Sequence, residues 1–365
     1  MLSPQELNRY SRHLLIPEFG IEGQEKLKAA NVLVVGCGGL GSPILLYLAA
    51  AGVGTIGIID NDRVDDSNLQ RQVLYGTDSI GKPKVEEATR RLQSLNPYIQ
   101  ITPYFAALTS QNVLTIFGDY DLIIDGSDNF PTRYLVNDAC ILLNKPFVYG
   151  AIYRFEGQVA IFNYQNGPNY RDLFPTPPPP ELTPNCAEAG VLGVLPGIIG
   201  SLQANEAIKL LTGIGTPLTG KLFVMDALTL TTRTIRIPLV PERVRVTELI
   251  DYEVFCGVTI PDVSQDIRPE MLVKLLSENT DFQLIDVREP QEYVIDNLKG
   301  ELMPLSQLAD FKDKISRHKI VVVHCQSGMR SQKAIAQLQE EFGFTNLKNL
   351  KGGLAGFRKY KEDNA

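Results

Sequence analysis

A glycine-rich turn at the end of an apolar run suits a bound phosphate. Gly36-Cys37-Gly38-Gly39-Leu40-Gly41 satisfies G-x-G-x-x-G and follows the β-branched run 31–35. Glycines let the backbone approach a phosphate, and the next helix offers free N–H groups and a positive dipole end. Asp60 ends a second apolar run, where its carboxylate can accept from ribose hydroxyls. The sequence therefore predicts a nucleotide site; a glycine turn without a ligand is the alternative.

Polar residues after Asp60 argue against a redox cofactor. Arg71 stands in Ser67-Asn-Leu-Gln-Arg-Gln72, and Lys84 ends Gly81-Lys-Pro-Lys84. An enzyme that cleaves a triphosphate uses such cations to neutralise the leaving pyrophosphate, whereas hydride transfer does not need them. Asp128 follows the candidate strand 122–125, where a carboxylate can hold Mg²⁺. The alternative is that these are solvated surface charges and a turn residue.

A second reactive loop lies near the C-terminus. Val321-Val-Val-His324 leads into Cys325-Gln-Ser-Gly-Met-Arg330, and a helix is expected from Ser331. Backbone N–H groups at a helix start and Arg330 can stabilise a thiolate, so Cys325 is a candidate nucleophile for an anionic substrate. Phosphatases of this general design have five residues between Cys and Arg. The four found here make a smaller cradle, which suits a sulfur-carrying cysteine.

Alternating strand and helix patterns position these motifs. They predict a doubly wound α/β domain over residues 1–245 and a small α/β domain over 263–365, joined by a linker at 246–262. In the first domain, strands are expected at 31–36, 55–59, 99–103, 122–125, 147–149, 158–162 and 221–226, and helices at 42–51, 84–95, 133–143 and 197–211. In the second, strands are expected at 282–286 and 319–324, and helices at 269–278 and 331–342.

Composition narrows the class of protein. The chain has 365 residues and a formal net charge of −7, which argues against a protein that mainly grips nucleic acid. It has no run of apolar residues long enough for a membrane span and no secretory signal at its start, so neither a membrane nor secretion is expected. Its cysteines are far apart and odd in number, which favours a reducing cytoplasm. They are Cys37, Cys140, Cys186, Cys256 and Cys325.

In these motifs the first part of the chain, about 1–245, resembles the ubiquitin-activating (E1)-like adenylyltransferases of the MoeB, ThiF and HesA type. The matching stretches are 9–12, 36–41, Asp60, 68–72, 81–84, 125–129, 186–190 and 200–209. The resemblance implies a Rossmann-like domain with a mixed sheet. It also implies a homodimer that uses ATP and Mg²⁺ to adenylate the C-terminal glycine of a small ubiquitin-fold sulfur-carrier protein ending in Gly-Gly.

The resemblance also implies residue roles. Asp60 would hold the ribose, Asp128 would hold Mg²⁺, and Arg12 would reach the triphosphate bound to the partner subunit. Asn68, Arg71 and Lys84 would contact the phosphates. The nucleotide-binding set carried over is Gly36, Gly38, Gly39, Gly41, Asp60, Asp62, Ser67, Asn68, Gln70, Arg71, Lys84, Asp128 and Asn129.

The family's zinc-binding cysteines are missing from this chain, whereas its acyl-accepting cysteine is present. Many relatives carry two C-x-x-C pairs that bind a structural zinc, but Asn169 and Asp172 replace the first pair, and no cysteine precedes Val246 in the second stretch. We therefore expect no zinc. Cys186 stands where some relatives have a cysteine that accepts the acyl group. It is a candidate catalytic residue, with buried packing as the alternative.

The second part, about 263–362, resembles a rhodanese domain, in which the loop cysteine carries a persulfide. Further matches are 284–290, Glu292-Tyr293 and 351–357, whereas Asp296-Asn-Leu298 and Phe357 depart from the usual pattern. An inactive rhodanese-like binding module is the alternative. The whole chain is similar to the MoeZ- and MoeBR-like fusion sulfurtransferases.

Together the two resemblances imply one product, a carrier protein with a C-terminal thiocarboxylate. The persulfide on Cys325 would attack the adenylate, and a second thiol, with Cys186 as the candidate, would release the product. A cysteine desulfurase or thiosulfate would supply the sulfur, and the pathway served, such as molybdopterin biosynthesis, is left open. Three other functions stay open. They are an adenylating enzyme for a small molecule or tRNA, an NAD-dependent oxidoreductase fused to a rhodanese-like module, and an ATP-binding scaffold without turnover.

Overall fold

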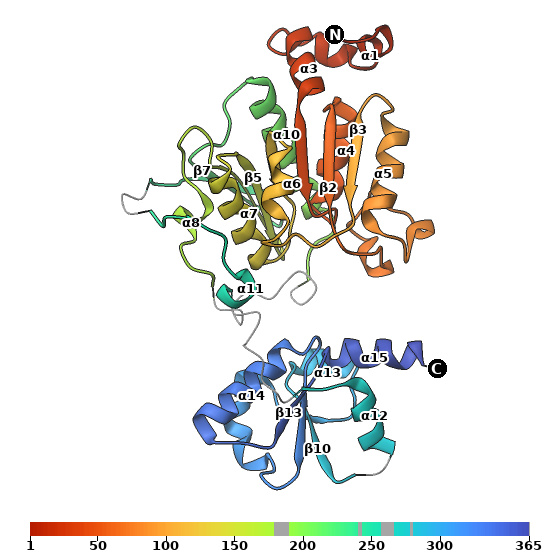
Figure 1. Ribbon diagram of the computed structural model, residues 1–365, viewed down its shortest axis with the longest axis vertical. Coiled ribbons are helices and arrows are strands. Elements are labelled where there is room, and N and C mark those ends of the chain that lie inside the picture. Colours follow the sequence, from red (N-terminus) through yellow and green to blue (C-terminus); the bar gives the residue numbers. More distant parts are fainter. Residues whose placement is uncertain (179–189, 240–242, 257–265, 278–279, 365) are drawn as a thin grey trace. The chain divides into compact units, whose positions relative to one another are not determined.

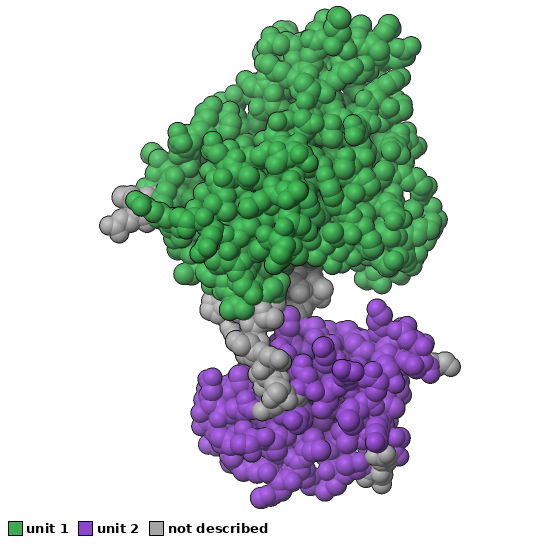
Figure 2. Space-filling view, in the orientation of Figure 1, with its two compact units in different colours: residues 1–257 green, residues 258–365 purple. Residues whose placement is uncertain are grey.

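The computed structural model describes residues 1–178, 190–239, 243–256, 266–277 and 280–364. The chain divides into two compact units, Met1–Gly257 and Val258–Ala365 (Figure 2). Each unit is described separately. No helix in the described part of the chain is long and apolar enough to cross a membrane.

The first unit is built on one eight-stranded sheet, ordered β3-β2-β1-β4-β5-β6-β7-β8. The first five strands in this order pair in parallel. Strands β6, β7 and β8 extend the sheet from β5, and each pairs antiparallel with the strand before it. This mixed sheet confirms the predicted fold class. The strands are β1 (Asn31–Val35), β2 (Thr55–Ile59), β3 (Gln100–Tyr104), β4 (Leu122–Asp125), β5 (Phe147–Tyr153), β6 (Glu156–Phe162), β7 (Lys221–Asp226) and β8 (Thr231–Arg236).

Helices cover both faces of this sheet (Figure 1). The central strands have no polar face because they are buried on both sides, as parallel strands usually are. Helices α3, α4, α5 and α10 share one face, and α6 and α7 share the other. The helices are α1 (Pro4–Arg9), α2 (Ser11–Leu14), α3 (Gly20–Ala29), α4 (Gly41–Ala51), α5 (Lys84–Leu95), α6 (Val113–Gly118), α7 (Phe130–Leu142), α8 (Tyr170–Leu173), α10 (Leu195–Thr212) and α11 (Tyr252–Phe255), with 3-10 turns η1 (Asp66–Asn68) and η2 (Thr77–Ser79).

The second unit is a five-stranded, wholly parallel sheet ordered β11-β10-β12-β13-β9. Its central strand β12 is buried from its second residue onward, as its Val-Val-Val run requires. The strands are β9 (Asp266–Ile267), β10 (Phe282–Asp286), β11 (Glu301–Leu302), β12 (Ile320–His324) and β13 (Leu347–Leu350). The helices are α12 (Pro269–Ser277), α13 (Pro290–Ile295), the 3-10 helix η4 (Leu305–Lys314), α14 (Met329–Phe342) and α15 (Gly353–Asp363).

The structure differs from the prediction in the first half of the expected linker, 246–262, which is part of the first unit. Residues up to Gly257 belong to the first unit, and α11 packs against α7. The Tyr252 hydroxyl donates to Asp138 Oδ2 at 2.8 Å, and the ring of Phe255 meets Tyr134 edge-on. These contacts are long-range, so the composition of the segment did not reveal them. Residues 257–262 lie outside the described part.

Candidate functional site

The glycine-rich turn connects β1 to α4 and is as tight as its sequence suggests. Gly36 has φ +85°, a left-handed conformation that favours glycine. A Cβ on Gly41 would lie 2.1 Å from the carbonyl oxygen of Gly36, so a side chain there would collide with the backbone. The Ser42 hydroxyl closes the turn by donating to Gly38 O at 2.8 Å. The turn therefore presents the free N–H groups at the start of α4 to a ligand.

Asp60, at the end of β2, holds this turn in place. Its Oδ2 accepts from the backbone N–H of Cys37 at 2.9 Å, and its Oδ1 accepts from that of Asp62 at 2.8 Å. The Tyr75 hydroxyl donates to Cys37 O at 2.8 Å from the other side. Each carboxylate oxygen has a further lone pair, so Asp60 can also accept from a ribose hydroxyl.

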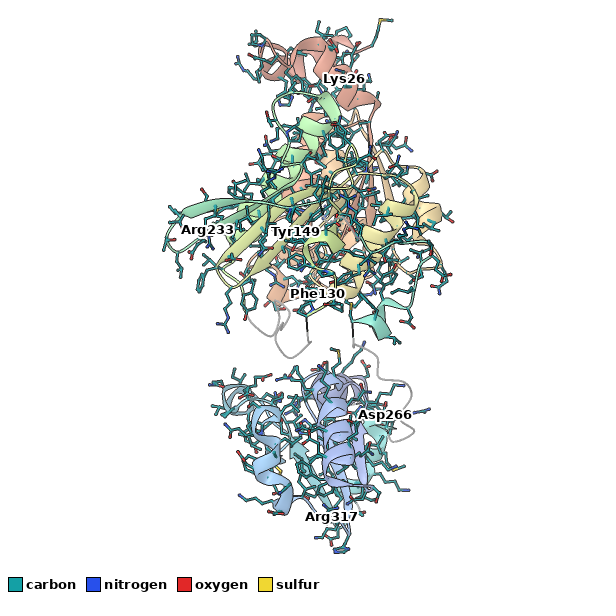
Figure 3. All side chains as sticks on the ribbon, turned by 90° about the vertical axis from the view of Figure 1, so that its left-hand side faces the viewer. Lys26, Phe130, Tyr149, Arg233, Asp266 and Arg317 are labelled. Carbon is teal, nitrogen blue, oxygen red and sulfur yellow. The ribbon has the colours of Figure 1, made fainter. Side chains whose placement is uncertain are left out.

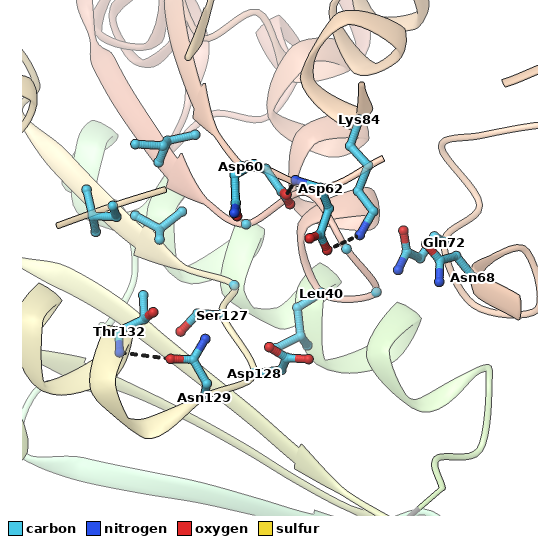
Figure 4. A pocket seen from close by; sticks show the side chains of 18 of the residues that line it. Leu40, Asp60, Asp62, Asn68, Gln72, Lys84, Ser127, Asp128, Asn129 and Thr132 are labelled. Atoms are coloured by element: carbon cyan, nitrogen blue, oxygen red, sulfur yellow. Dashed lines mark hydrogen bonds and ion pairs between the residues drawn. The ribbon is translucent and has the colours of Figure 1, made fainter. Parts of the chain in front are cut away.

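A cavity of about 390 Å³ opens at the carboxyl ends of β1, β2 and β4 (Figure 4). This is the end at which open α/β sheets bind ligands. The cavity brings together ten of the thirteen predicted nucleotide-binding residues. They are Gly36, Gly38, Gly39, Asp60, Asp62, Asn68, Arg71, Lys84, Asp128 and Asn129.

Two cations line one side of the cavity. Lys84 begins α5, and its ammonium group lies 2.8 Å from Asp62 Oδ2, with only 5% of the Lys84 side chain exposed. Arg71 donates to Ser67 O at 3.1 Å. Lys84 is buried and Arg71 is half-buried, and both line the cavity beside the glycine turn, where they can pair with phosphates.

The opposite side is formed by the segment after β4. Asp125 is fully buried, and its Oδ1 accepts from both the backbone N–H and the hydroxyl of Ser127, at 2.9 and 2.6 Å. Burial raises the pKa of Asp125. This turn leaves Asp128 exposed on the cavity wall, while Asn129 caps α7 by accepting from Thr132 N at 2.9 Å. Asp125 therefore shapes the turn, and Asp128 is the carboxylate presented to a ligand.

The site fits Mg²⁺ better than a metal held by protein alone. No group of three or more His, Cys, Asp or Glu side chains within the described ranges could hold a metal ion. Mg²⁺ usually takes one or two carboxylates and completes its shell with water and substrate phosphates. Asp128, across the cavity from Arg71 and Lys84, suits that arrangement.

Three of the predicted nucleotide-binding residues do not line the cavity. Gly41 supports the turn from within, Ser67 donates to Asp65 Oδ1 at 2.6 Å, and Gln70 packs beside Gly193. Cys186 lies outside the described residues.

Arg12 is exposed in α2, at the other end of the unit. Helix α3 leads directly into the start of β1, so the N-terminal helices adjoin the amino ends of the strands. Lys26 of α3 and Phe130, the first residue of α7, lie at opposite ends of this unit (Figure 3). A nucleotide role for Arg12 therefore requires a second copy of the chain.

The cavity-lining residues that were not predicted include Gln72 and Arg133. Gln72 is 3% exposed and its Oε1 has no hydrogen-bond partner among the described residues. Arg133, in the first turns of α7, is 8% exposed and also lines the cavity. The sequence carries a signal for Gln72, which ends the polar segment 67–72, but none for Arg133 apart from its position four residues after Asn129.

Hydrogen bonds from several neighbouring elements hold the cysteine loop of the second unit. Cys325 is 1% exposed, and its Sγ accepts from Gly328 N at 3.2 Å and lies 3.6 Å from the Ser331 hydroxyl. Gly328 has φ +98°. The start of α15 holds the loop, because Leu354 N donates to Cys325 O at 2.8 Å. The loop thus directs one backbone N–H, that of Gly328, at the sulfur. The nucleophilic role of Cys325 stays a prediction.

Arg330 pairs with a neighbouring helix. Its guanidinium donates to both carboxylate oxygens of Glu292 in α13, each at 2.7 Å. These hydrogen bonds hold the pKa of Glu292 below its usual value. On the other side, Arg288 donates to Gln326 Oε1 at 3.1 Å and to Asp286 Oδ2 at 2.7 Å. The matched segments 284–290 and 292–293 therefore fix the loop from outside.

An ion pair joins the two segments in which relatives carry the zinc-binding cysteines. Asp172 Oδ2 lies 3.4 Å from Arg243 Nε, with 2% and 32% of the two side chains exposed. Asn169 and Asp172 also form a capping box at α8. Arg243 donates to Gly167 O at 3.4 Å. The sequence did not indicate what joins these two segments, and in the structure this ion pair links them.

We expect purified protein to contain far less than one zinc per chain, because Asn169, Asp172 and Arg243 offer no thiolate. Arg243→Ala should destabilise the first unit by about 1–2 kcal/mol, since the buried Asp172 carboxylate loses its cation and keeps only the hydrogen bond from Asn169 N. Elemental analysis and denaturant unfolding of the full chain measure these effects. Arg233→Ala, which breaks an exposed pair with Glu156, is the control and should be nearly neutral. One zinc per chain, or equal effects of the two variants, would refute this account.

Comparisons with known proteins agree with the two units. The model of the ThiF family matches residues 10–245, and that of the rhodanese-like domain matches 269–360. The probable adenylyltransferase/sulfurtransferase MoeZ of Mycobacterium tuberculosis is 47% identical over 371 residues, covering 98% of this chain and 94% of its own length. The sulfur carrier protein adenylyltransferase of Thermus thermophilus is 54% identical over 265 residues, covering 70% and 98%. Adenylyltransferase and sulfurtransferase MOCS3 of Drosophila grimshawi is 41% identical over 388 residues, covering 100% and 86%.

Solved structures share the fold of the first unit. A crystal structure of PaaA is 26% identical, with a TM-score of 0.56, covering 66% of this chain and 76% of its own. E. coli MccB with ATP is 24% identical, with a TM-score of 0.58, covering 66% and 74%, and shows likeness of fold alone. The chain therefore belongs to the ThiF family and carries a rhodanese-like domain in its C-terminal unit.

Proposed function

We propose that this enzyme adenylates the C-terminal glycine of a small ubiquitin-fold sulfur-carrier protein and then converts it to a thiocarboxylate. The observation that carries the proposal is a cavity that joins a glycine turn, two cations and Asp128 in a chain that also has an intact cysteine loop. The names of the MoeZ and MOCS3 relatives support both activities, and that of the Thermus thermophilus relative supports the carrier substrate.

In the first step, a carboxylate oxygen of the carrier attacks the α-phosphorus of ATP. A phosphorus–oxygen bond forms, the bond to the bridging oxygen breaks, and pyrophosphate leaves. No general base is needed, because the attacking carboxylate is already ionised. Arg71 and Lys84 neutralise the leaving group, the glycine turn holds the phosphates, and Asp60 orients the ribose. Mg²⁺ held by Asp128 would neutralise phosphate charge.

In the second step, the terminal sulfur of a Cys325 persulfide attacks the acyl carbon and AMP leaves. The product is an acyl disulfide between the carrier and Cys325. A second thiolate, with Cys186 as the candidate, then attacks the Cys325 sulfur. This releases the carrier thiocarboxylate and leaves a protein disulfide, which cellular thiols reduce in the cytoplasm. A cysteine desulfurase or thiosulfate restores the persulfide.

We infer further that the enzyme acts as a homodimer. Arg12 is remote from the cavity of its own chain, so a partner subunit must supply it if it contacts the triphosphate. Two subunits would then share each site.

The test is to incubate the protein with ATP, Mg²⁺ and purified ubiquitin-fold carriers ending in Gly-Gly. We expect carrier-dependent ATP–pyrophosphate exchange, and a carrier mass gain of one sulfur for one oxygen when a persulfide donor or thiosulfate is added. Exchange that depends on a small molecule or tRNA instead of a carrier would favour those substrates. ATP binding without exchange would favour a scaffold, and nicotinamide binding would favour an oxidoreductase.

A further inference from the structure

Arg133 is a buried cation that forms no direct ion pair with a carboxylate in the described part of the chain, although the charge of the buried Asp125 acts on it from a longer distance. Only 8% of it is exposed, yet it forms no ion pair within 4.0 Å with any described residue, and its Nε has no hydrogen-bond partner there. Its one hydrogen bond is long, 3.4 Å from Nη2 to Ser127 O. Burying a guanidinium costs several kcal/mol unless its charge is met, so such a group in a cavity wall indicates an anionic ligand.

Two aromatic rings hold the guanidinium in place. Its carbon lies 5.3 Å from the centre of the Phe130 ring and 5.6 Å from that of Tyr149. Cation–π contacts stabilise the charge and orient the guanidinium, but they leave its N–H groups available. The arrangement is therefore preorganised for an acceptor inside the cavity that Arg133 lines.

The position of Arg133 separates it from the cations expected at the pyrophosphate. Arg71 and Lys84 follow β2, whereas Arg133 lies in α7, after β4. Figure 4 shows Lys84 on one side of the cavity and Thr132, in the first turn of α7, on the other, and Arg133 of the same helix also lines the cavity. In phosphoryl-type transfer the attacking group and the leaving group are roughly in line, so they approach from opposite sides. The side opposite Lys84 is where the attacking carboxylate belongs.

We propose that Arg133 binds the C-terminal carboxylate of the substrate that is adenylated. A guanidinium matches a carboxylate with two parallel N–H···O bonds. It would also neutralise the repulsion between this carboxylate and the triphosphate. The inference rests on the proposed function and assigns the residue that recognises the reacting group.

The test compares two forms of one carrier protein, ending in Gly-Gly carboxylate or in Gly-Gly carboxamide. Binding of each form to the full chain is measured by calorimetry without ATP, so that no reaction follows. Wild type should prefer the carboxylate by about 10–100-fold, the range expected of a charge-assisted hydrogen-bonded pair. Arg133→Gln should bind both forms equally, near the wild-type affinity for the carboxamide.

Arg71→Gln is the matched control and should weaken binding of a non-hydrolysable ATP analogue while keeping the carboxylate preference. Thermal unfolding checks the fold. If Arg133→Gln does not fold, Arg133→Lys, which keeps the charge but not the fork, should show a reduced preference. Loss of affinity for both carrier forms alike, or weaker binding of the ATP analogue alone, would overturn the proposal. A wild type that binds neither form would instead refute the carrier substrate itself.

Discussion

Asp128→Ala should abolish carrier-dependent ATP–pyrophosphate exchange and leave the fold intact. The carboxylate is exposed on the cavity wall, opposite Arg71 and Lys84, so its loss removes the expected ligand of Mg²⁺ without disturbing the core. Removing one such contact to developing charge costs ~10²–10³-fold in rate or more. Exchange is measured with radiolabelled pyrophosphate at saturating carrier, and thermal unfolding reports on the fold.

Asp66→Ala is the control for this substitution. Asp66 is an equally exposed carboxylate in η1, near the same site, but it does not line the cavity. It should leave exchange within about twofold of wild type, because an exposed carboxylate outside the cavity meets no developing charge. Near wild-type exchange by Asp128→Ala would refute the Mg²⁺ role of Asp128.

Cys325→Ala should leave adenylation unchanged and stop sulfur transfer. The residues proposed for adenylation all lie in the first unit, whereas Cys325 lies in the second, between β12 and α14. Its sulfur is the one that receives backbone N–H donation from Gly328, at a loop also held by Arg330. The measurement is carrier mass after incubation with ATP and a persulfide donor or thiosulfate. Exchange should persist, and the mass of the thiocarboxylate should be missing.

Two further cysteine variants test whether the loss of sulfur transfer is specific to Cys325. Cys256→Ala should transfer sulfur normally, because burial raises the pKa of Cys256 to about 12 and keeps it a neutral thiol. Cys186→Ala should have a milder or more variable effect than Cys325→Ala, since only product release depends on it. If Cys325→Ala forms thiocarboxylate at a normal rate, the rhodanese-like unit is a binding module and sulfur comes from a partner or from free sulfide.

The sequence determined the features that rest on local patterns. The strand, glycine turn and helix at 31–51 form as predicted because steric needs, such as that of Gly41 against Gly36 O, are local. The parallel strands of the first unit, and β10 and β12 of the second, were also predicted from their apolar runs, whereas β9, β11 and β13 were not. Because the carboxyl ends of such strands share one edge, Asp60, Lys84 and Asp128 meet there despite their separation in the chain.

Elements whose sequences lack a clear apolar periodicity were not predicted. The edge strand β8, Thr231–Arg236, is exposed at every residue, so it lacks the apolar alternation by which a strand is recognised. The short α11 was predicted as linker because one turn of helix is stabilised by packing against α7 and not by its own sequence.

Only the tertiary structure decided which charges meet. Asp172 finds Arg243, and Arg330 finds Glu292, because folding brings together segments that no spacing rule connects. Arg133, in contrast, is buried without a direct ion pair to any described carboxylate, and this too became visible only in the folded structure. The physical reason is desolvation. Moving a charged side chain out of water costs free energy, and this cost arises only where the side chain is buried. Which side chains are buried depends on how the whole chain folds, so the sequence alone does not show it.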